Sequence, residues 1–222
     1  YRLMVADADG FGPRTVTESS LPIMSPAWSP DGQSLAYVSF EGRMSAIYVQ
    51  RLATGERRRV SARAGINGAP AWSPDGKRLA LTLSRDGNLD VYVLDLATQG
   101  LTRLTTDSAI DTEPEWSPDG ASVYFTSDRA GNAQVYRVGV GAGQEPQRLT
   151  FTNGYNARPR MSPDGQALAL VTLDRGGAIE PGPDGGLRPV RTEALRFALS
   201  VPNAPMPEGG WLEISAEVEE GR

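Results

Sequence analysis

One five-residue motif returns four times in this chain at a nearly constant interval. Trp-Ser-Pro-Asp-Gly occupies residues 28–32, 72–76 and 116–120, and residues 161–165 carry the same motif with Met in place of Trp. The first three copies are 44 residues apart, and the fourth follows after 45. A fixed period of this length indicates a repeat architecture in which each repeat forms one structural unit.

The rest of each repeat predicts four short strands. Runs rich in Val, Ile, Tyr and Thr alternate with turns rich in Gly, Pro, Asp and Asn, and the apolar residues recur with a period near two. Four strands in a repeat of roughly 40–45 residues are the signature of a β-propeller blade. We therefore predict an all-β fold, a β-propeller of four-stranded antiparallel blades, and we expect no helix.

The period divides the chain into blades and a tail. We assign residues 1–173 to propeller repeats, with a part blade at 1–24, blades at 25–68, 69–112 and 113–157, and a part blade at 158–173. A propeller needs about four to eight blades to close. Either the two part blades join in one sheet and close a ring of four, or blades are missing at both ends and the propeller is incomplete.

Residues 174–222 depart from the repeat. They hold 9 acidic and 5 basic residues, whereas residues 1–173 hold 18 and 17, so most of the net charge of −5 belongs to this tail. A weak match to the motif at residues 206–209 leaves a degraded blade open, but we favour coincidence in a Gly- and Pro-rich segment, and an unrelated module is a further alternative. The chain begins at Tyr1 inside an expected strand and shows no signal peptide, so we expect a fragment of a longer protein.

The repeated motif has the chemistry of a turn. Pro sets φ, Asp accepts hydrogen bonds from the backbone after it, and Gly supplies positive φ. The Trp before it has the area to fill the wedge between neighbouring blades. The four Asp residues (31, 75, 119 and 164) fall in separate blades, so they cannot form one catalytic or metal site.

Composition excludes several functions. The chain has no His and no Cys, which removes Ser-His-Asp catalysis and zinc sites built on those residues. Its acidity argues against binding to duplex nucleic acid, and no apolar run approaches the ~18 residues of a membrane span. We therefore expect a protein that binds and does not catalyse, with no catalytic residue, no metal ligand and no cofactor.

The two faces of such a propeller differ. The repeated motif joins the first strand of a blade to the second, so it lies at one end, while the turns after the second strand and the crossovers between blades share the other. The crossovers (21–24, 62–69, 106–113 and 152–158) vary between repeats, and variable loops on a rigid scaffold usually carry function. We nominate these partner-binding residues: Met24, Ile66, Asn67, Ala69, Asp111, Thr112, Glu113, Tyr155, Asn156 and Arg158. The alternative is that they only plug the mouth of the channel.

Beyond the repeat itself, segments 1–10, 23–32, 67–72, 91–97 and 112–116 resemble the TolB family, the periplasmic propellers of the Tol-Pal envelope system. The resemblance covers residues 1–173 and implies a six-bladed propeller behind an N-terminal α/β domain. It implies a periplasmic scaffold that binds the lipoprotein Pal, communicates with TolA, supports outer-membrane integrity and cell division, and is used by colicins. Four residues match the family's contact loops: Met24, Ile66, Ala69 and Thr112. Ile66 stands where a relative can carry His, and the resemblance also implies that the channel could hold a divalent cation.

Two other functions stay open. Prolyl-oligopeptidase-like serine peptidases use similar repeats in an accessory propeller, but their catalysis needs a hydrolase domain with a nucleophilic Ser and a His. This chain has no His, so it could supply only the accessory part. The remaining reading is a truncated or chimeric product without an intact function.

Overall fold

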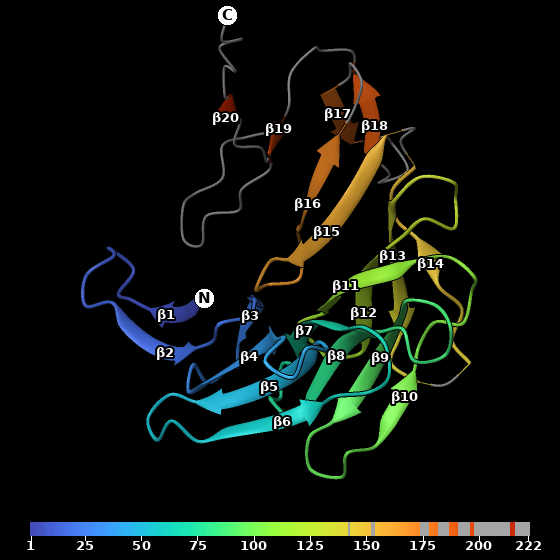
Figure 1. Ribbon diagram of the computed structural model, residues 1–222. Coiled ribbons are helices and arrows are strands. Elements are labelled where there is room, and N and C mark those ends of the chain that lie inside the picture. Colours follow the sequence, from blue (N-terminus) through green and yellow to red (C-terminus); the bar gives the residue numbers. More distant parts are fainter. Residues whose placement is uncertain are drawn as a thin grey trace, which may run out of the picture.

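The computed structural model describes residues 1–141, 143–151 and 154–173, together with the backbone of four short strands between 178 and 215 (Figure 1). No helix occurs in these described residues, which confirms the predicted all-β class. The weak match to the motif at 206–209 lies outside them.

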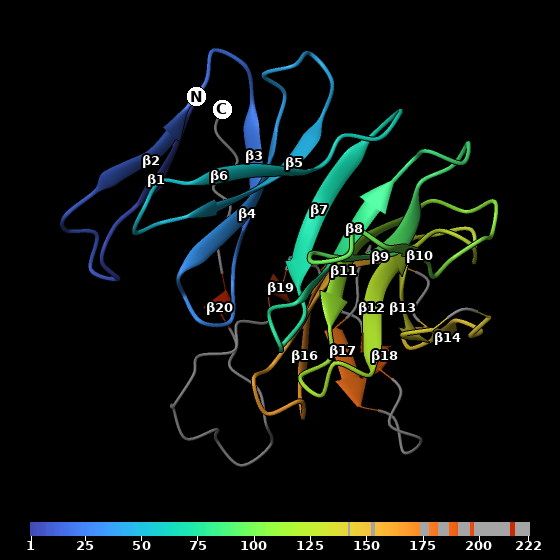
Figure 2. The same ribbon diagram turned by 90° about the horizontal axis from the view of Figure 1, so that it is seen from below.

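Three consecutive repeats each form one four-stranded antiparallel sheet whose strands pair in chain order, as predicted. The first sheet contains β3 (Ile23–Trp28), β4 (Ser34–Ser39), β5 (Ala46–Arg51) and β6 (Arg57–Ser61). The second contains β7 (Asn67–Trp72), β8 (Arg78–Leu83), β9 (Asp90–Asp95) and β10 (Leu101–Arg103). The third contains β11 (Asp111–Trp116), β12 (Ser122–Ser127), β13 (Gln134–Gly139) and β14 (Gln147–Arg148). Figure 2 shows these sheets following one another around the molecule.

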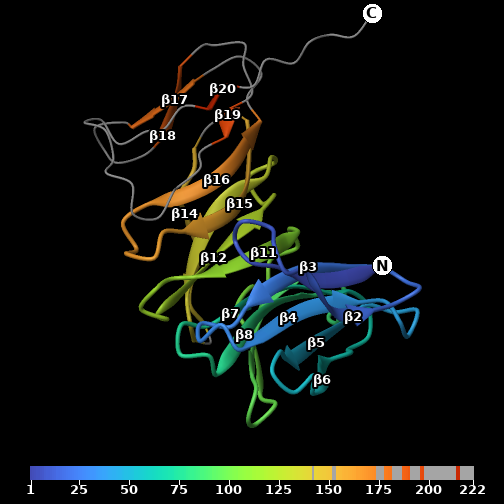
Figure 3. The same cartoon turned by 90° about the vertical axis from the view of Figure 1, so that its left-hand side faces the viewer.

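The two ends of the array differ. At the start, β1 (Arg2–Val5) pairs with β2 (Arg14–Glu18) in a separate two-stranded sheet. At the other end, β15 (Tyr155–Met161) and β16 (Leu168–Leu173) form a four-stranded sheet with β19 (Arg196–Phe197) and β20 (Ile214–Ser215). A hairpin of β17 (Ala178–Pro181) and β18 (Leu187–Val190) lies beyond β16 (Figure 3). Because β1 and β2 pair only with each other among the described strands, the two part blades do not share a sheet. The propeller is incomplete.

Neighbouring sheets bury each other's faces. The inner strands β3, β7, β11 and β15 lie side by side in that order. Between the first two sheets, Val38 and Ile47 pack with Leu81, and between the second and third, Val93 packs with Phe125. Because sheets cover both faces of β8, its residues from Leu79 to Leu83 are all buried. Apart from Thr82 this run is apolar, as expected of a strand that is buried on both faces.

The repeated Trp locks blades together. The indole Nε1 of Trp116 donates to the Ala71 carbonyl oxygen, and that of Trp72 to the Ala27 carbonyl oxygen, each at 3.1 Å. Trp116 is only 4% exposed, so the predicted wedge is confirmed there. Trp28 is 52% exposed, because the described residues before it form only β1 and β2 and place no inner strand against it.

The repeated turn has the expected chemistry. In the third copy, Ser117 Oγ donates to Asp119 Oδ1 at 2.5 Å, and the Ala121 N–H donates to the same oxygen at 3.0 Å. These bonds, the hydroxyl first, lower the pKa of Asp119. Gly120 follows with a φ of 68°. The other three copies repeat both hydrogen bonds, so this motif is accounted for by structure.

Candidate functional site

The candidate site is the mouth of the propeller that carries the crossovers between blades. Four large apolar side chains are exposed there, and we call them the apolar rim: Met24 (45%), Ile66 (52%), Ile110 (48%) and Tyr155 (45%). Ile66, Ile110 and Tyr155 are equivalent residues of successive repeats. Ile110 is not among the residues nominated from the sequence, although it lies 44 residues after Ile66 and that spacing could have identified it.

The inner strands begin earlier than expected, which corrects the assignment of most nominated residues to crossover loops. Ile66 lies in a crossover, but nine residues lie within the inner strands: Met24 in β3, Asn67 and Ala69 in β7, Asp111, Thr112 and Glu113 in β11, and Tyr155, Asn156 and Arg158 in β15. The reason is that strand pairing resumes on the far side of an irregularity near each proline. Met24, for example, pairs with Val38.

That irregularity is the same β-bulge in every blade. The residue before each inner-strand Pro has a left-handed backbone, with φ of 51° at Ser25, 45° at Ala69, 55° at Glu113 and 56° at Arg158. The pairing register shifts at each of these sites. Since Pro has no N–H to give to the ladder, a bulge accommodates it. A left-handed non-glycine residue costs roughly 1–2 kcal/mol, and strained backbone of this kind clusters at binding and catalytic sites.

Three nominated polar residues lie beneath this surface. Asn67, Asp111 and Asn156 are fully buried. The Asn67 carboxamide oxygen accepts from Ser61 Oγ at 2.7 Å and from the Arg63 N–H at 3.0 Å, and its nitrogen donates to the Arg63 carbonyl oxygen at 2.8 Å. Asn67 therefore holds the crossover that presents Ile66.

Asp111 supports the next crossover through charge. Arg129 Nη2 lies 2.7 Å from Asp111 Oδ2, and in the same region Arg103 Nη2 lies 2.6 Å from Asp90 Oδ2. Both carboxylates are fully buried, and burial raises the pKa of each, with the arginines opposing that effect. Removing one partner of a buried ion pair leaves an uncompensated buried charge and strongly destabilises the fold. These two pairs therefore hold the framework of the mouth in place.

Two ion pairs join the inner strands β11 and β15, one at the bulge and one nearer the repeated turn. Arg158 Nε lies 2.9 Å from Glu113 Oε1, and Arg160 Nη1 lies 3.1 Å from Glu115 Oε2. Burial raises the pKa of Glu115, opposed by the charge of Arg160. The equivalent residues of β3 and β7 are Ser or Ala, so the inner strands are charged on the side of β11 and β15 and small and uncharged on the side of β3 and β7.

Within the part of the chain that the structure describes, no three acidic side chains gather closely enough to hold a metal ion. The divalent cation that the family resemblance implies therefore has no ligand cluster among these residues. No helix long and apolar enough to cross a membrane occurs in the same described part.

Comparison with known proteins gives one family. Residues 1–180 match the family described as "TolB beta propeller domain". The Tol-Pal system protein TolB of Methylococcus capsulatus is 70% identical over 69 residues, which are 31% of this chain and 16% of the relative. Its counterpart from Coxiella burnetii is 64% identical over 69 residues, with the same coverage.

Solved structures agree. TolB from Acinetobacter baumannii superposes with a TM-score of 0.77 and 43% identity over 88% of this chain and 51% of that one. The chain thus spans about half the length of that relative. A prolyl endopeptidase superposes with a TM-score of 0.63 over 90% of this chain and 34% of that one, but at 15% identity this likeness concerns the fold alone.

Proposed function

This chain belongs to the TolB β-propeller family, and from that premise we propose that it is a non-enzymatic periplasmic scaffold of the Tol-Pal system. In this proposal the mouth bearing the apolar rim binds the lipoprotein Pal. The proposal extends to communication with TolA, to use by colicins, and to a role in outer-membrane integrity and cell division.

The apolar rim is the observation that carries the proposal. Ile66, Ile110 and Tyr155 are each about half exposed, although each stands on a backbone held by buried polar groups. Large apolar side chains grouped on a surface mark protein interaction sites, and a preorganised surface loses less entropy on binding. Side chains that only plugged a channel would be packed on most sides, which the exposed fractions do not support.

The nominated residues divide into two roles in this proposal. Met24, Ile66, Tyr155 and Arg158 contact the partner directly, joined by Ile110, with Ala69, Thr112 and Glu113 at the edges of the bulges. Asn67, Asp111 and Asn156 are buried, so they position the surface. The alternative function, an accessory propeller of a serine peptidase, rests only on the distant fold likeness, and no described residue favours it.

The experiment measures binding of soluble Pal to Ile66→Asp and Ile110→Asp by isothermal titration calorimetry. Each variant places a charge at the centre of an apolar contact, and we expect a Kd about tenfold or more weaker, a loss of about 1.4 kcal/mol or more. Phe11→Asp is the matched control, because Phe11 is an exposed apolar residue in the turn between β1 and β2. Equal Pal affinity in all three variants, or no binding by the unaltered chain, would overturn the proposal.

A further inference from the structure

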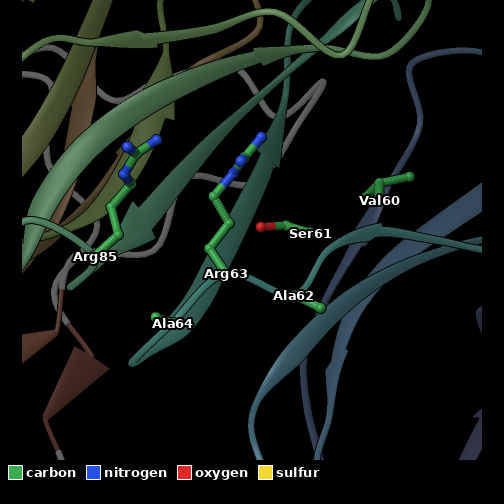
Figure 4. Close-up of a pocket in the computed structure, with 6 residues that line it drawn as sticks. All are labelled: Val60, Ser61, Ala62, Arg63, Ala64 and Arg85. Atoms are coloured by element: carbon green, nitrogen blue, oxygen red, sulfur yellow. The ribbon is translucent and has the colours of Figure 1, made fainter.

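A cleft of about 440 Å³ opens on the same mouth, and its lining reaches Ala64, two residues before Ile66 in the chain (Figure 4). It lies between the crossover that follows β6 and the turn that joins β8 to β9. Its lining is formed by Val60, Ser61, Ala62, Arg63, Ala64 and Arg85. The only charged groups in that lining are the two guanidinium groups, and Figure 4 shows both arginine side chains extending in the same direction.

The backbone around the cleft is held in place. The Ile66 N–H donates to Ser84 Oγ at 2.7 Å, and the Ser84 N–H donates to the Ile66 carbonyl oxygen at 3.1 Å. Gly65 has a φ of 81°, and a Cβ at this residue would lie 2.3 Å from Ser84 Oγ. The crossover therefore sits directly against the β8–β9 turn, and this contact places Arg63 next to Arg85.

The two cations are poorly compensated. Among the described residues, the Arg63 guanidinium makes no ion pair and no side-chain hydrogen bond. Arg85 Nε lies 3.2 Å from Asp86 Oδ1, but both side chains are substantially exposed and a surface pair of this kind contributes little. Asp86 also accepts a hydrogen bond from Tyr92 Oη at 2.7 Å. A single carboxylate, which also accepts from Tyr92, thus lies against Arg85, and none of the described carboxylates pairs with Arg63.

We propose that this cleft binds a carboxylate, supplied by an Asp or Glu side chain of the protein that docks on the mouth. Two planar guanidinium groups offer donors in the fork arrangement that matches a carboxylate. Because exposed Ile66 follows the lining residue Ala64 by two positions, the matching partner surface presents an acidic side chain near an apolar one. This inference rests on the proposed function, since it names the chemistry of the partner at the same mouth.

The first test uses a small carboxylate alone. Succinate is titrated into the ¹⁵N-labelled full chain at constant ionic strength, and the arginine Nε–Hε NMR signals are followed against a chloride titration. We expect the Arg63 and Arg85 signals to move together and saturate, while that of Arg59, an exposed residue of β6, follows the chloride control. Signals of Arg63 and Arg85 that move no more than that of Arg59 would overturn the assignment of the cleft.

The second test identifies the source of the carboxylate. Binding of Pal is measured for Arg63→Gln, Arg85→Gln and the control Arg59→Gln, which all remove one positive charge. We expect a Kd about tenfold weaker for each cleft variant, and a change of less than about twofold for the control. The Kd for Pal could stay unchanged in both cleft variants while the unaltered chain still binds succinate. That result would show that the ligand is a free carboxylate and would contradict the protein source. If the unaltered chain binds succinate but not Pal, the proposed function fails while the carboxylate site stands.

Discussion

Replacing Gly65 with Ala tests how closely the crossover sits against the β8–β9 turn. Two penalties arise from the structure. The φ of 81° places the residue in the left-handed region, where a side chain costs roughly 1–2 kcal/mol. The added Cβ would also lie 2.3 Å from Ser84 Oγ, so the serine side chain must rotate away. That rotation breaks its hydrogen bond with the Ile66 N–H, worth about 1 kcal/mol.

We therefore expect Gly65→Ala to lower the free energy of unfolding by about 2–3 kcal/mol. Gly87→Ala is the matched control, because Gly87 has a φ of 96° and an added Cβ would meet nothing within 4 Å. It should incur only the backbone penalty, about 1–2 kcal/mol. In a Ser84→Ala background the clashing oxygen is gone, so Gly65→Ala should there cost about the same as Gly87→Ala.

The assay is urea unfolding followed by tryptophan fluorescence and circular dichroism at pH 7. It yields the free energy of unfolding of the parent chain, the single variants and the Ser84→Ala double variant. Equal losses for Gly65→Ala and Gly87→Ala, within about 0.3 kcal/mol, would refute the reasoning from the close contact. A full Gly65→Ala penalty that persists in the Ser84→Ala background would do the same.

Two further outcomes concern residues of the repeated motif. Trp116→Phe removes the donor to the Ala71 carbonyl oxygen and should lower the free energy of unfolding by about 1–3 kcal/mol. Trp28→Phe, at a 52% exposed residue, should change that free energy by less than about 0.5 kcal/mol. Equal effects of the two variants in urea unfolding would contradict the interblade role of Trp116. Since hydrogen bonds to Ser117 and the backbone lower the folded-state pKa of Asp119, its stabilising effect is present above its unfolded pKa, near 3.9, and is lost as pH falls through the lower folded value. Asp119→Asn should therefore be less stable than the parent at pH 7, and the gap should close as the pH falls below about 4. A gap that stays constant in acid unfolding would exclude this linkage.

The fold was largely predictable because the turns are local. Pro, Asp and Gly act within five residues of each other, so a turn can be predicted from the sequence wherever the motif recurs. The middle of the strand that follows each motif is mainly apolar, as in β8, which is what a strand buried on both faces requires. Period and turn chemistry together are sufficient to predict four-stranded blades.

The site was less predictable because it depends on departures from local rules. A residue before proline ordinarily takes an extended conformation, yet Ala69 has a φ of 45° before Pro70. That bulge lets strand pairing continue and draws Asn67 out of the expected loop and into the buried start of β7. The pair of Arg63 and Arg85 was hidden for another reason, since it depends on Gly65 meeting a turn from a different part of the repeat.

The bulge before the inner-strand proline makes the backbone geometry of the blade independent of the side chain at that position. Four different side chains, those of Ser25, Ala69, Glu113 and Arg158, occupy one and the same backbone kink, so the kink does not depend on which side chain it carries. Selection can therefore change the chemistry at these four places while the blades keep their architecture. A combinatorial library randomised at these four residues would therefore vary four side chains of the inner strands while the blades keep the same backbone.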